Sequence, residues 1–303
     1  MKYARLSGEV KSPLRYPGGK SRAIPQIIPL IPPFKEYREP FIGGGSVFVA
    51  VKQRAASDAT FKINDLNQDL YCLWKVLRDE PERLIDAIKE TKARYVEGAE
   101  LNRDMRDWQC NDDFERAVRF FIINRTSFSG LSDSGGFSQQ AFRSRFTDSS
   151  IARLVKMKPI MKDVIITNDD YHVLLEDEGD DVFIFLDPPY FKAMKKRLYG
   201  KDGDLHVGFD HERFARDMQA CHHKWLITYD DAPEIRDLFG FATIYDWELQ
   251  YGMNNFMQGS AAAGKELFIM NYTPSTKPET PATEQKTKGN FTSLDAFLKK
   301  VNE

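Results

Sequence analysis

The sequence predicts an α/β protein with a mostly parallel sheet, an antiparallel terminal pair and an inserted, mainly helical domain. Three observations support this fold class. Short apolar runs of buried-strand length alternate with helical patterns, and several end at a carboxylate. The stretch 70–158 shows almost only helical periodicity. The last two expected strands, 242–249 and 267–272, enclose a loop rich in glycine and alanine, which favours antiparallel pairing.

The composition is that of an ordinary globular protein. Of the 303 residues, 42% are hydrophobic and 29% are charged, and the formal net charge is -2. The chain as a whole is therefore no polycation. A site for nucleic acid would have to be a local basic surface.

Cysteine and histidine usage predicts neither a disulfide framework nor a metal site. The cysteines Cys72, Cys110 and Cys221 lie far apart in the sequence, and the adjacent His222 and His223 do not face the same way on a helix. No apolar run approaches the ~20 residues that span a bilayer, and no signal-peptide core is present. We therefore expect a cytoplasmic protein.

The first informative segment is a tight turn, Pro17-Gly18-Gly19, between Tyr16 and Lys20. Its glycines allow the backbone to approach a ligand closely, with both flanking side chains alongside. Taken alone, such a turn more often just precedes a helix. The apolar segment 24–31 that follows predicts a helix interrupted by proline and ended by two further prolines.

A short strand, a glycine turn and a helix start follow in the segment 37–51. This order is typical of the opening βα unit of a nucleotide-binding domain. Gly43 and Gly45 lack the third glycine of the dinucleotide fingerprint, so a phosphate cradle is not implied.

The next expected strand, 60–65, ends in Asp65, about 20 residues beyond Gly45. An acidic residue at that distance is suited to accept hydrogen bonds from both hydroxyls of a ribose. The alternative is that Asp65 or Asn67 caps the following helix, 70–77, and both interpretations can hold for neighbouring residues.

Within the helical insertion, the segment 124–140 is polar, punctuated by glycine and spaced with phenylalanine, and predicts a loop or short hairpin. A merely solvated loop is the alternative. In and around this segment lie cationic, amide, hydroxyl and aromatic side chains of the kinds that bind phosphates and base edges. The expected DNA-binding set here is Arg119, Asn124, Arg125, Ser134, Phe137, Arg143 and Arg145.

The α/β pattern then resumes with expected strands at 164–167, 182–186 and 224–229, and with a helix at 209–221 between the last two. The first of these strands closes on Asp170 and Tyr171.

The strand 182–186 is stopped by Asp187-Pro188-Pro189-Tyr190. Proline fixes φ and removes an N–H, so these residues form a stiff turn beyond the carboxyl end of the sheet, where ligands bind. An aspartate there is, on its own, more often a cap or a solvated turn residue. The cations that follow suit phosphates beside a bound nucleotide, although a plain solvated basic segment is equally compatible: Lys192, Lys195, Lys196 and Arg197.

These strand ends share one edge of a parallel sheet. A ligand with its amino-acid end near Lys20, a ribose at Asp65 and a purine near Asp170 and Tyr171 fits S-adenosylmethionine better than a phosphorylated nucleotide. Asp187 and its turn would then face the methyl acceptor.

The chain resembles the Dam-type, DNA adenine-N6-specific methyltransferases over roughly residues 10–272. The motifs that carry the resemblance are Tyr16-Pro17-Gly18-Gly19-Lys20, Glu39-Pro40-Phe41-Ile42-Gly43-Gly44-Gly45-Ser46, Asn64-Asp65, Asn124-Arg125 with Gly130-Leu131, and Asp187-Pro188-Pro189-Tyr190. The resemblance implies a Rossmann-like, S-adenosylmethionine-dependent catalytic domain (1–69 and 159–274) with an inserted target-recognition domain (70–158). The polar tail, 275–303, is expected to be disordered.

The resemblance also implies the roles of site residues. The expected cofactor site comprises Tyr16, Lys20, Phe41, Gly43, Gly45, Asp65, Asp170 and Tyr171. The expected reaction moves a methyl group to N6 of an adenine flipped out of double-stranded DNA, with no obligate protein partner. Asp187 and the Pro188 carbonyl would accept the amino protons, Pro189 would stiffen the turn and Tyr190 would stack on the base.

One segment departs from the family pattern. Many members have Arg-Tyr-Asn shortly after Gly-Leu, whereas this chain has Ser-Asp-Ser-Gly-Gly-Phe at 132–137. Base contacts common in the family, and recognition of GATC, therefore cannot be carried over. Cytosine-N4 methyltransferases, which usually have Ser where this chain has Asp187, protein-glutamine methyltransferases, which usually have Asn there, and an inactive DNA-binding protein on the same fold remain alternatives.

Overall fold

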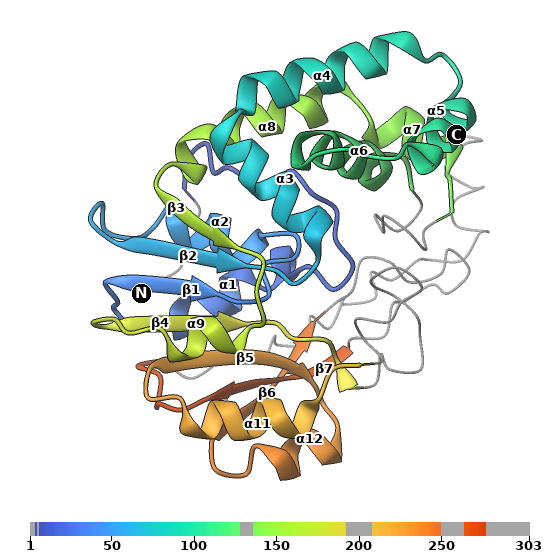
Figure 1. Ribbon diagram of the computed structural model, residues 1–303. Coiled ribbons are helices and arrows are strands. Elements are labelled where there is room, and N and C mark those ends of the chain that lie inside the picture. The colour runs from blue at the N-terminus through green and yellow to red at the C-terminus, as the bar shows by residue number, and fades with distance from the viewer. Residues whose placement is uncertain (1–3, 5, 128–135, 192–207, 250–263, 277–303) are drawn as a thin grey trace, which may run out of the picture.

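The computed structural model describes residues 4, 6–127, 136–191, 208–249 and 264–276. They contain a seven-stranded sheet with the strand order β3-β2-β1-β4-β5-β7-β6 (Figure 1). β7 runs antiparallel to β5 and to β6, and the remaining pairs are parallel. This confirms the predicted mostly parallel sheet with an antiparallel terminal pair. The strands are β1 (Glu36–Glu39), β2 (Thr60–Asn64), β3 (Val164–Thr167), β4 (Val182–Leu186), β5 (Lys224–Asp230), β6 (Thr243–Leu249) and β7 (Gly264–Met270).

β4 lies at the centre of the sheet and is buried along its whole length. Phe183 and Phe185 pack into the hydrophobic core on one face, and Val182, Ile184 and Leu186 pack into the core on the other. A strand covered on both faces needs a continuous apolar run, which is why this segment could be recognised in the sequence.

Helices cover both faces of the sheet. α1 (Ile24–Ile27) and α2 (Ser46–Lys52) pack on one face, where α1 continues into the 3₁₀ turn η2 (Ile28–Leu30) as the prolines predict. The face turned to the viewer in Figure 1 carries three further helices, of which the sequence predicts one, at 209–221. They are α9 (His172–Glu176), α11 (His211–Ala220) and α12 (Pro233–Leu238).

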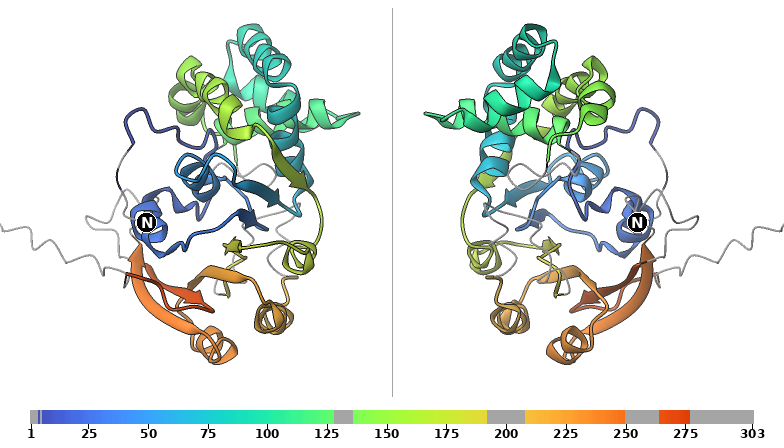
Figure 2. Two further views of the ribbon diagram at one scale, coloured as in Figure 1. Left: turned by 90° about the vertical axis from the view of Figure 1, so that its left-hand side faces the viewer. Right: turned by 90° about the vertical axis from the view of Figure 1, so that its right-hand side faces the viewer.

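A helical unit lies between β2 and β3 and stands above the sheet in every view (Figures 1 and 2). Asn67 begins it, because its side chain caps α3 by accepting hydrogen bonds from the Asp69 and Leu70 amides. Both expected borders of the inserted domain, 69/70 and 158/159, fall inside helices. The helices are α3 (Gln68–Asp79), α4 (Pro81–Arg94), α5 (Gly98–Asp107), α6 (Asp113–Thr126), α7 (Gln139–Arg145) and α8 (Asp148–Met161).

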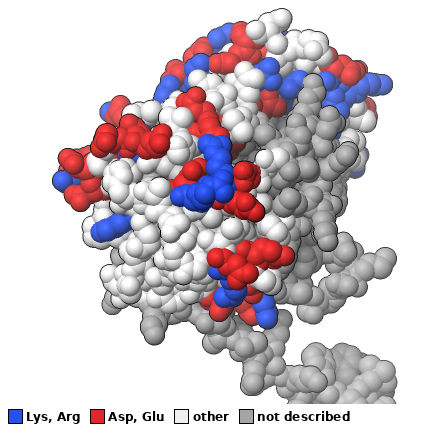
Figure 3. Space-filling model, turned by 60° about the horizontal axis from the view of Figure 1, so that its bottom comes forward, with Lys and Arg blue, Asp and Glu red and all other residues white. Residues whose placement is uncertain are grey.

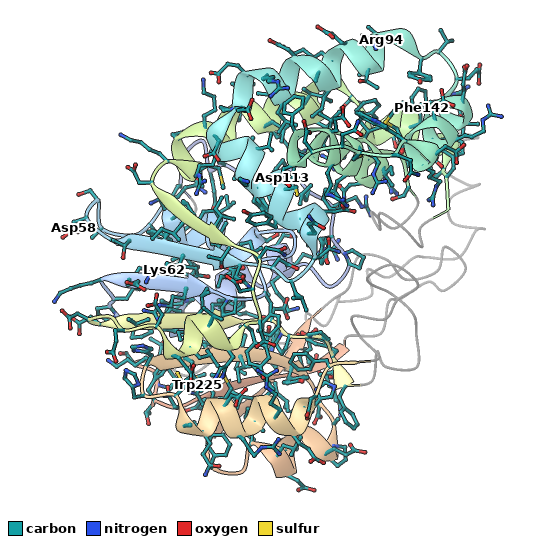
Figure 4. The ribbon with its side chains drawn as sticks, viewed as in Figure 1. Asp58, Lys62, Arg94, Asp113, Phe142 and Trp225 are labelled. Carbon is teal, nitrogen blue, oxygen red and sulfur yellow. The ribbon has the colours of Figure 1, made fainter. Side chains whose placement is uncertain are left out.

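The helical unit is packed closely. The Asp113 carboxylate accepts a hydrogen bond of 2.7 Å from Lys75 and so ties α6 to α3, and Phe142 of α7 lies against Gly98 of α5, where a Cβ would come within 2.4 Å of the ring (Figure 4). Its apolar side chains belong to the same core cluster as α1, α2 and one face of the sheet. The helical unit and the sheet therefore share one continuous core.

No helix in the described part of the chain is long and apolar enough to cross a bilayer. The expected disordered tail lies almost wholly outside the described residues, which end at residue 276.

Candidate active site

A pocket of about 1050 Å³ opens at the carboxyl ends of the parallel strands. The order of strands reverses between β1 and β4, which is where open α/β sheets bind ligands. The pocket brings together every residue that the sequence assigned to cofactor binding or catalysis. Its lining includes Tyr16, Lys20, Phe41, Gly43, Gly45, Asp65, Asp170, Tyr171, Asp187, Pro188, Pro189 and Tyr190.

The glycine turn after β1 is wedged between two aromatic rings. Gly43 and Gly45 have φ of +44° and +66°, in the left-handed region that disfavours other residues. A Cβ on Gly43 would lie 3.0 Å from the Tyr16 ring, and one on Gly45 would lie 2.8 Å from Trp74. The Trp74 indole N–H donates to the Gly43 carbonyl over 3.1 Å. The turn is therefore fixed between the N-terminal segment and α3.

The Asp65 carboxylate links this turn to the residue that caps α3. Its Oδ2 accepts a hydrogen bond of 2.8 Å from the Gly43 amide, and its Oδ1 accepts one of 2.9 Å from the Asn67 amide. Burial raises the pKa of Asp65 to about 6, although both amide bonds oppose the shift. A carboxylate oxygen can accept two hydrogen bonds, so each oxygen keeps capacity for a ligand hydroxyl.

Aromatic rings and an ion pair form one end of the pocket. The Phe41 and Tyr171 rings lie 5.4 Å apart, and the Tyr171 hydroxyl donates to Asp217 over 2.7 Å. Arg213 binds both oxygens of Asp170 at 3.0 Å. Burial tends to raise the pKa of Asp170, but the hydrogen bonds from Arg213 hold it below its ordinary value. The flat apolar rings of Phe41 and Tyr171, beside the fixed carboxylate of Asp170, suit a purine ring.

Lys20 joins the expected cofactor side of the pocket to the turn after β4. Lys20 is 3% exposed, and its ammonium lies 2.8 Å from both oxygens of Asp187 and donates to the Gly18 carbonyl over 2.8 Å. It also lies 4.8 Å from the centre of the Tyr190 ring, as a cation–π contact. One cation therefore contacts the side chains of both Asp187 and Tyr190.

Side chains of β5 and β7 complete the support of this turn, and sequence reasoning missed them. Thr228 donates to Asp187 Oδ1 over 2.8 Å, Asp230 accepts from the Phe191 amide over 2.9 Å, and Glu266 accepts from the Tyr190 hydroxyl over 2.7 Å. A signal for them existed, because they are polar residues inside otherwise apolar strands. Since β7 runs antiparallel, Glu266 at its start shares the edge with the carboxyl ends of its neighbours.

Two of the expected DNA contacts bind other groups of the protein. Asn124 is 0% exposed, and its amide exchanges hydrogen bonds with the backbone N–H and carbonyl of Arg15 over 3.3 and 2.7 Å. Arg119 donates to the Trp108 carbonyl over 3.2 Å and lies 3.7 Å from Asp69. Both side chains therefore tie α6 to neighbouring segments, and their contacts with DNA stay a prediction.

Arg125 belongs to a group of arginines at the base of the expected loop. It is 4% exposed, and burial together with the positive charges of Arg153, Arg15 and Arg145 lowers its pKa to about 10. Arg145 donates to the Ser127 carbonyl over 3.2 Å. Such a concentration of like charge favours a nearby anion.

The remaining expected DNA contacts divide between exposed, half-buried and undescribed positions. Arg143 is exposed on α7, and the half-buried Phe137 forms an antiparallel bridge with Ser127 that closes the base of the loop. Ser134, Lys192, Lys195, Lys196 and Arg197 lie outside the described residues. In the ranges that are described, no three histidine, cysteine or acidic side chains are grouped as a metal ion would require.

Comparison with known proteins gives a family for this chain. Residues 16–253 match the model of the family described as D12 class N6 adenine-specific DNA methyltransferase. The Type II methyltransferase M.MjaIII of Methanocaldococcus jannaschii is 27% identical over 60% of this chain and 70% of its own length. M1.LlaDCHI of Lactococcus lactis, also named a Type II methyltransferase, is 24% identical over 85% of this chain and 94% of its own length. The DNA N-6-adenine-methyltransferase of Escherichia phage P1 is 27% identical over 76% of this chain and 31% of its own length.

Proposed function

The chain belongs to the D12 class of N6 adenine-specific DNA methyltransferases, and we propose that it moves the methyl group of S-adenosylmethionine to an adenine flipped out of double-stranded DNA. Methyltransferases of this kind use S-adenosylmethionine in general. One observation carries the proposal. The glycine turn, Asp187 and Tyr190 line the same pocket, and Lys20 in this pocket contacts both Asp187 and Tyr190.

The charged side chains that line the pocket suit this cofactor. S-Adenosylmethionine carries a sulfonium and an ammonium but no phosphate, so an acidic lining complements it better than a basic cradle would. Acidic side chains outnumber the basic Lys20, Arg213 and Lys265 in the lining. The acidic ones are Glu39, Asp65, Asp170, Asp187, Asp210, Asp230 and Glu266.

Each part of the ligand has a proposed partner. Asp65 accepts hydrogen bonds from the ribose hydroxyls through its remaining lone pairs, and Phe41 and Tyr171 pack on the adenine ring beside Asp170. The pocket volume of about 1050 Å³ leaves room for a base as well. When bound, the cofactor supplies an electrophilic methyl group.

Asp187 and the Pro188 carbonyl orient the amino group of the target adenine. The nitrogen lone pair is delocalised into the ring, so the amino group is a weak nucleophile until acceptors hold its protons as it pyramidalises. A carboxylate offers roughly four lone-pair positions. Thr228 and Lys20 occupy those of Asp187 in part, since Lys20 contacts both oxygens, and capacity for an adenine N–H remains.

Recognition of DNA is proposed to come from the base of the helical unit. Arg15, Arg125, Arg145 and Arg153 form a local concentration of positive charge suited to phosphates, with Arg143 exposed near by. On the face shown in Figure 3, acidic and basic side chains are interspersed instead. The cations at 192–197 extend the proposed phosphate contacts, and they lie outside the described residues.

The direct test is to incubate the purified protein with labelled S-adenosylmethionine and unmethylated duplex DNA, and then to identify the labelled nucleoside after digestion. We expect label in N6-methyladenine alone. Label in N4-methylcytosine, in protein, or in nothing would contradict the proposal.

A further inference from the structure

Two carboxyl groups on neighbouring strands accept hydrogen bonds from the turn after β4 and the residue that follows it. One belongs to β5 and the other to β7. Asp230 and Glu266 are register partners in the antiparallel pair of these strands. Asp230 accepts the Phe191 amide over 2.9 Å, and Glu266 accepts the Tyr190 hydroxyl over 2.7 Å. The ring of Tyr190 therefore has a fixed anchor at its hydroxyl end, while Lys20 lies over its face.

Glu266 is an unusual group to find inside a sheet. It is 1% exposed, and its Oε1 has no hydrogen-bond partner among the described residues. Burying an unsatisfied carboxyl oxygen opposes folding, and a side chain of similar size without charge would avoid the cost. A functional reason is therefore needed for a carboxyl group at this position.

The charged and titratable groups around Glu266 come from every neighbouring element. Lys20 reaches it from η1 (Lys20–Arg22), Asp187 and Tyr190 from the turn after β4, and Asp230 from β5, whereas its register partner on β6 is the uncharged Trp247. Burial raises the pKa of Glu266 to about 7, with Asp187 and Asp230 adding to the shift and Lys20 and Tyr190 opposing it. This carboxyl group therefore changes its charge within the neutral range.

We propose that Glu266 is a positioning residue for methyl transfer, and that its ionised form fixes the Tyr190 ring for stacking on the target base. An ionised carboxylate accepts a stronger hydrogen bond from a phenol than a neutral carboxyl group does. When Glu266 is protonated, the hydroxyl of Tyr190 loses its charged acceptor and the ring gains freedom. The inference rests on the proposed function, because it concerns the stacking partner of the flipped adenine.

The pH dependence has a definite sign. Protonation below about pH 7 neutralises Glu266, so the rate of methyl transfer in a single turnover should rise from mildly acidic pH through about 7 and then level off. Glu266→Gln keeps the size and a carbonyl acceptor but cannot ionise. We expect its rate to be flat through this range and about tenfold below the native plateau.

A second variant separates positioning from simple structural support. Tyr190→Phe removes the hydroxyl that Glu266 holds, so it should show the same flat profile, and adding Glu266→Gln to it should cost nothing further. The matched control is Glu248→Gln, on the adjacent strand β6, where Glu248 is exposed and pairs in register with Lys265. It should keep the native profile.

The fluorescence of a base analogue reports stacking on Tyr190 directly. A merely structural role of Glu266 would leave this fluorescence unchanged. With 2-aminopurine in place of the target adenine, stacking on Tyr190 quenches emission in the complex. Above pH 7, Glu266→Gln should leave the complex brighter than the native protein does, while its affinity for S-adenosylmethionine by calorimetry stays close to native.

The outcomes distinguish this inference from the proposal on which it rests. A native protein that leaves no label on DNA refutes both. A native protein that labels adenine, together with a Glu266→Gln variant that keeps the native pH profile and fluorescence, refutes the role of Glu266 alone. Additive losses in the double variant would also refute it.

Discussion

Lys20 is the residue on which the two sides of the pocket depend. It was expected to bind the cofactor, and its ammonium contacts both oxygens of Asp187 and the face of Tyr190. The sequence shows only that a lysine follows a glycine turn. Its distance of 167 positions from Asp187 explains why this pairing could not be predicted, since it depends on how η1 packs against the end of β4.

Asp65 leads to a prediction on cofactor affinity. Asp65→Ala should weaken the binding of S-adenosylmethionine roughly 10- to 100-fold, because it removes the proposed hydrogen bonds between a charged acceptor and the ribose. Since burial raises the pKa of Asp65 to about 6, native affinity should fall as the pH drops through 6 and the acceptor is neutralised. Asp65→Asn keeps an acceptor but should lose this pH dependence.

Calorimetry across this pH range checks both effects. Asp58→Ala is the matched control, because Asp58 is exposed in the turn before β2, far from the pocket (Figure 4). Unchanged affinity in Asp65→Ala would remove the ribose role.

At the scale of single residues, the sequence predicts which side chains lie at strand ends. It does not show which hydrogen bonds and ion pairs those side chains make. Asn124 and Arg125 were grouped with the DNA contacts because amides and cations bind phosphates and base edges. Their surroundings separate them, since Asn124 binds the Arg15 backbone while Arg125 lies near the positive charges of other arginines. Burial of a polar residue in a helix is a tertiary property.

At the scale of elements, the glycine turn after β1 is the most constrained feature of the pocket. Gly45 has φ of +66°, and a Cβ would come within 2.8 Å of Trp74. Gly45→Ala should therefore destabilise the protein by about 2 kcal/mol, from left-handed strain and from the displaced indole.

Urea unfolding measures this loss of stability. Gly136→Ala serves as the control, because a Cβ there meets no atom within 4 Å, and it should leave the midpoint unchanged. Equal midpoints for the two variants would show that the turn is not held between Tyr16 and Trp74.

The strands were predictable because a sheet covered on both faces requires apolar runs, as in β4 and β5. α12 was not, since its six residues contain only one buried side chain, Ile235, and begin at a proline that reads as a turn. The expected borders of the inserted domain fall within α3 and α8, because helical periodicity does not show at which residue a helix begins or ends.

At the scale of the whole molecule, the inserted helices and the sheet share one core, and α3 contacts the glycine turn directly through Trp74. The helical unit therefore has a fixed place relative to the pocket. The fold class and this insertion followed from the sequence because their periodicities differ. The recognition sequence did not, since the loop that departs from the family pattern lies largely outside the described residues.

We propose that Asp187 acts on the methyl acceptor and not on the cofactor. Its carboxylate is fixed by Thr228 and Lys20 beside the Pro188 carbonyl, where the amino group of a flipped adenine would be oriented. The most direct measurement pairs methyl transfer to duplex DNA with cofactor affinity in the Asp187→Ala variant. We predict that transfer falls by about a thousandfold while the affinity for S-adenosylmethionine stays close to native. Turnover near the native rate would contradict the account.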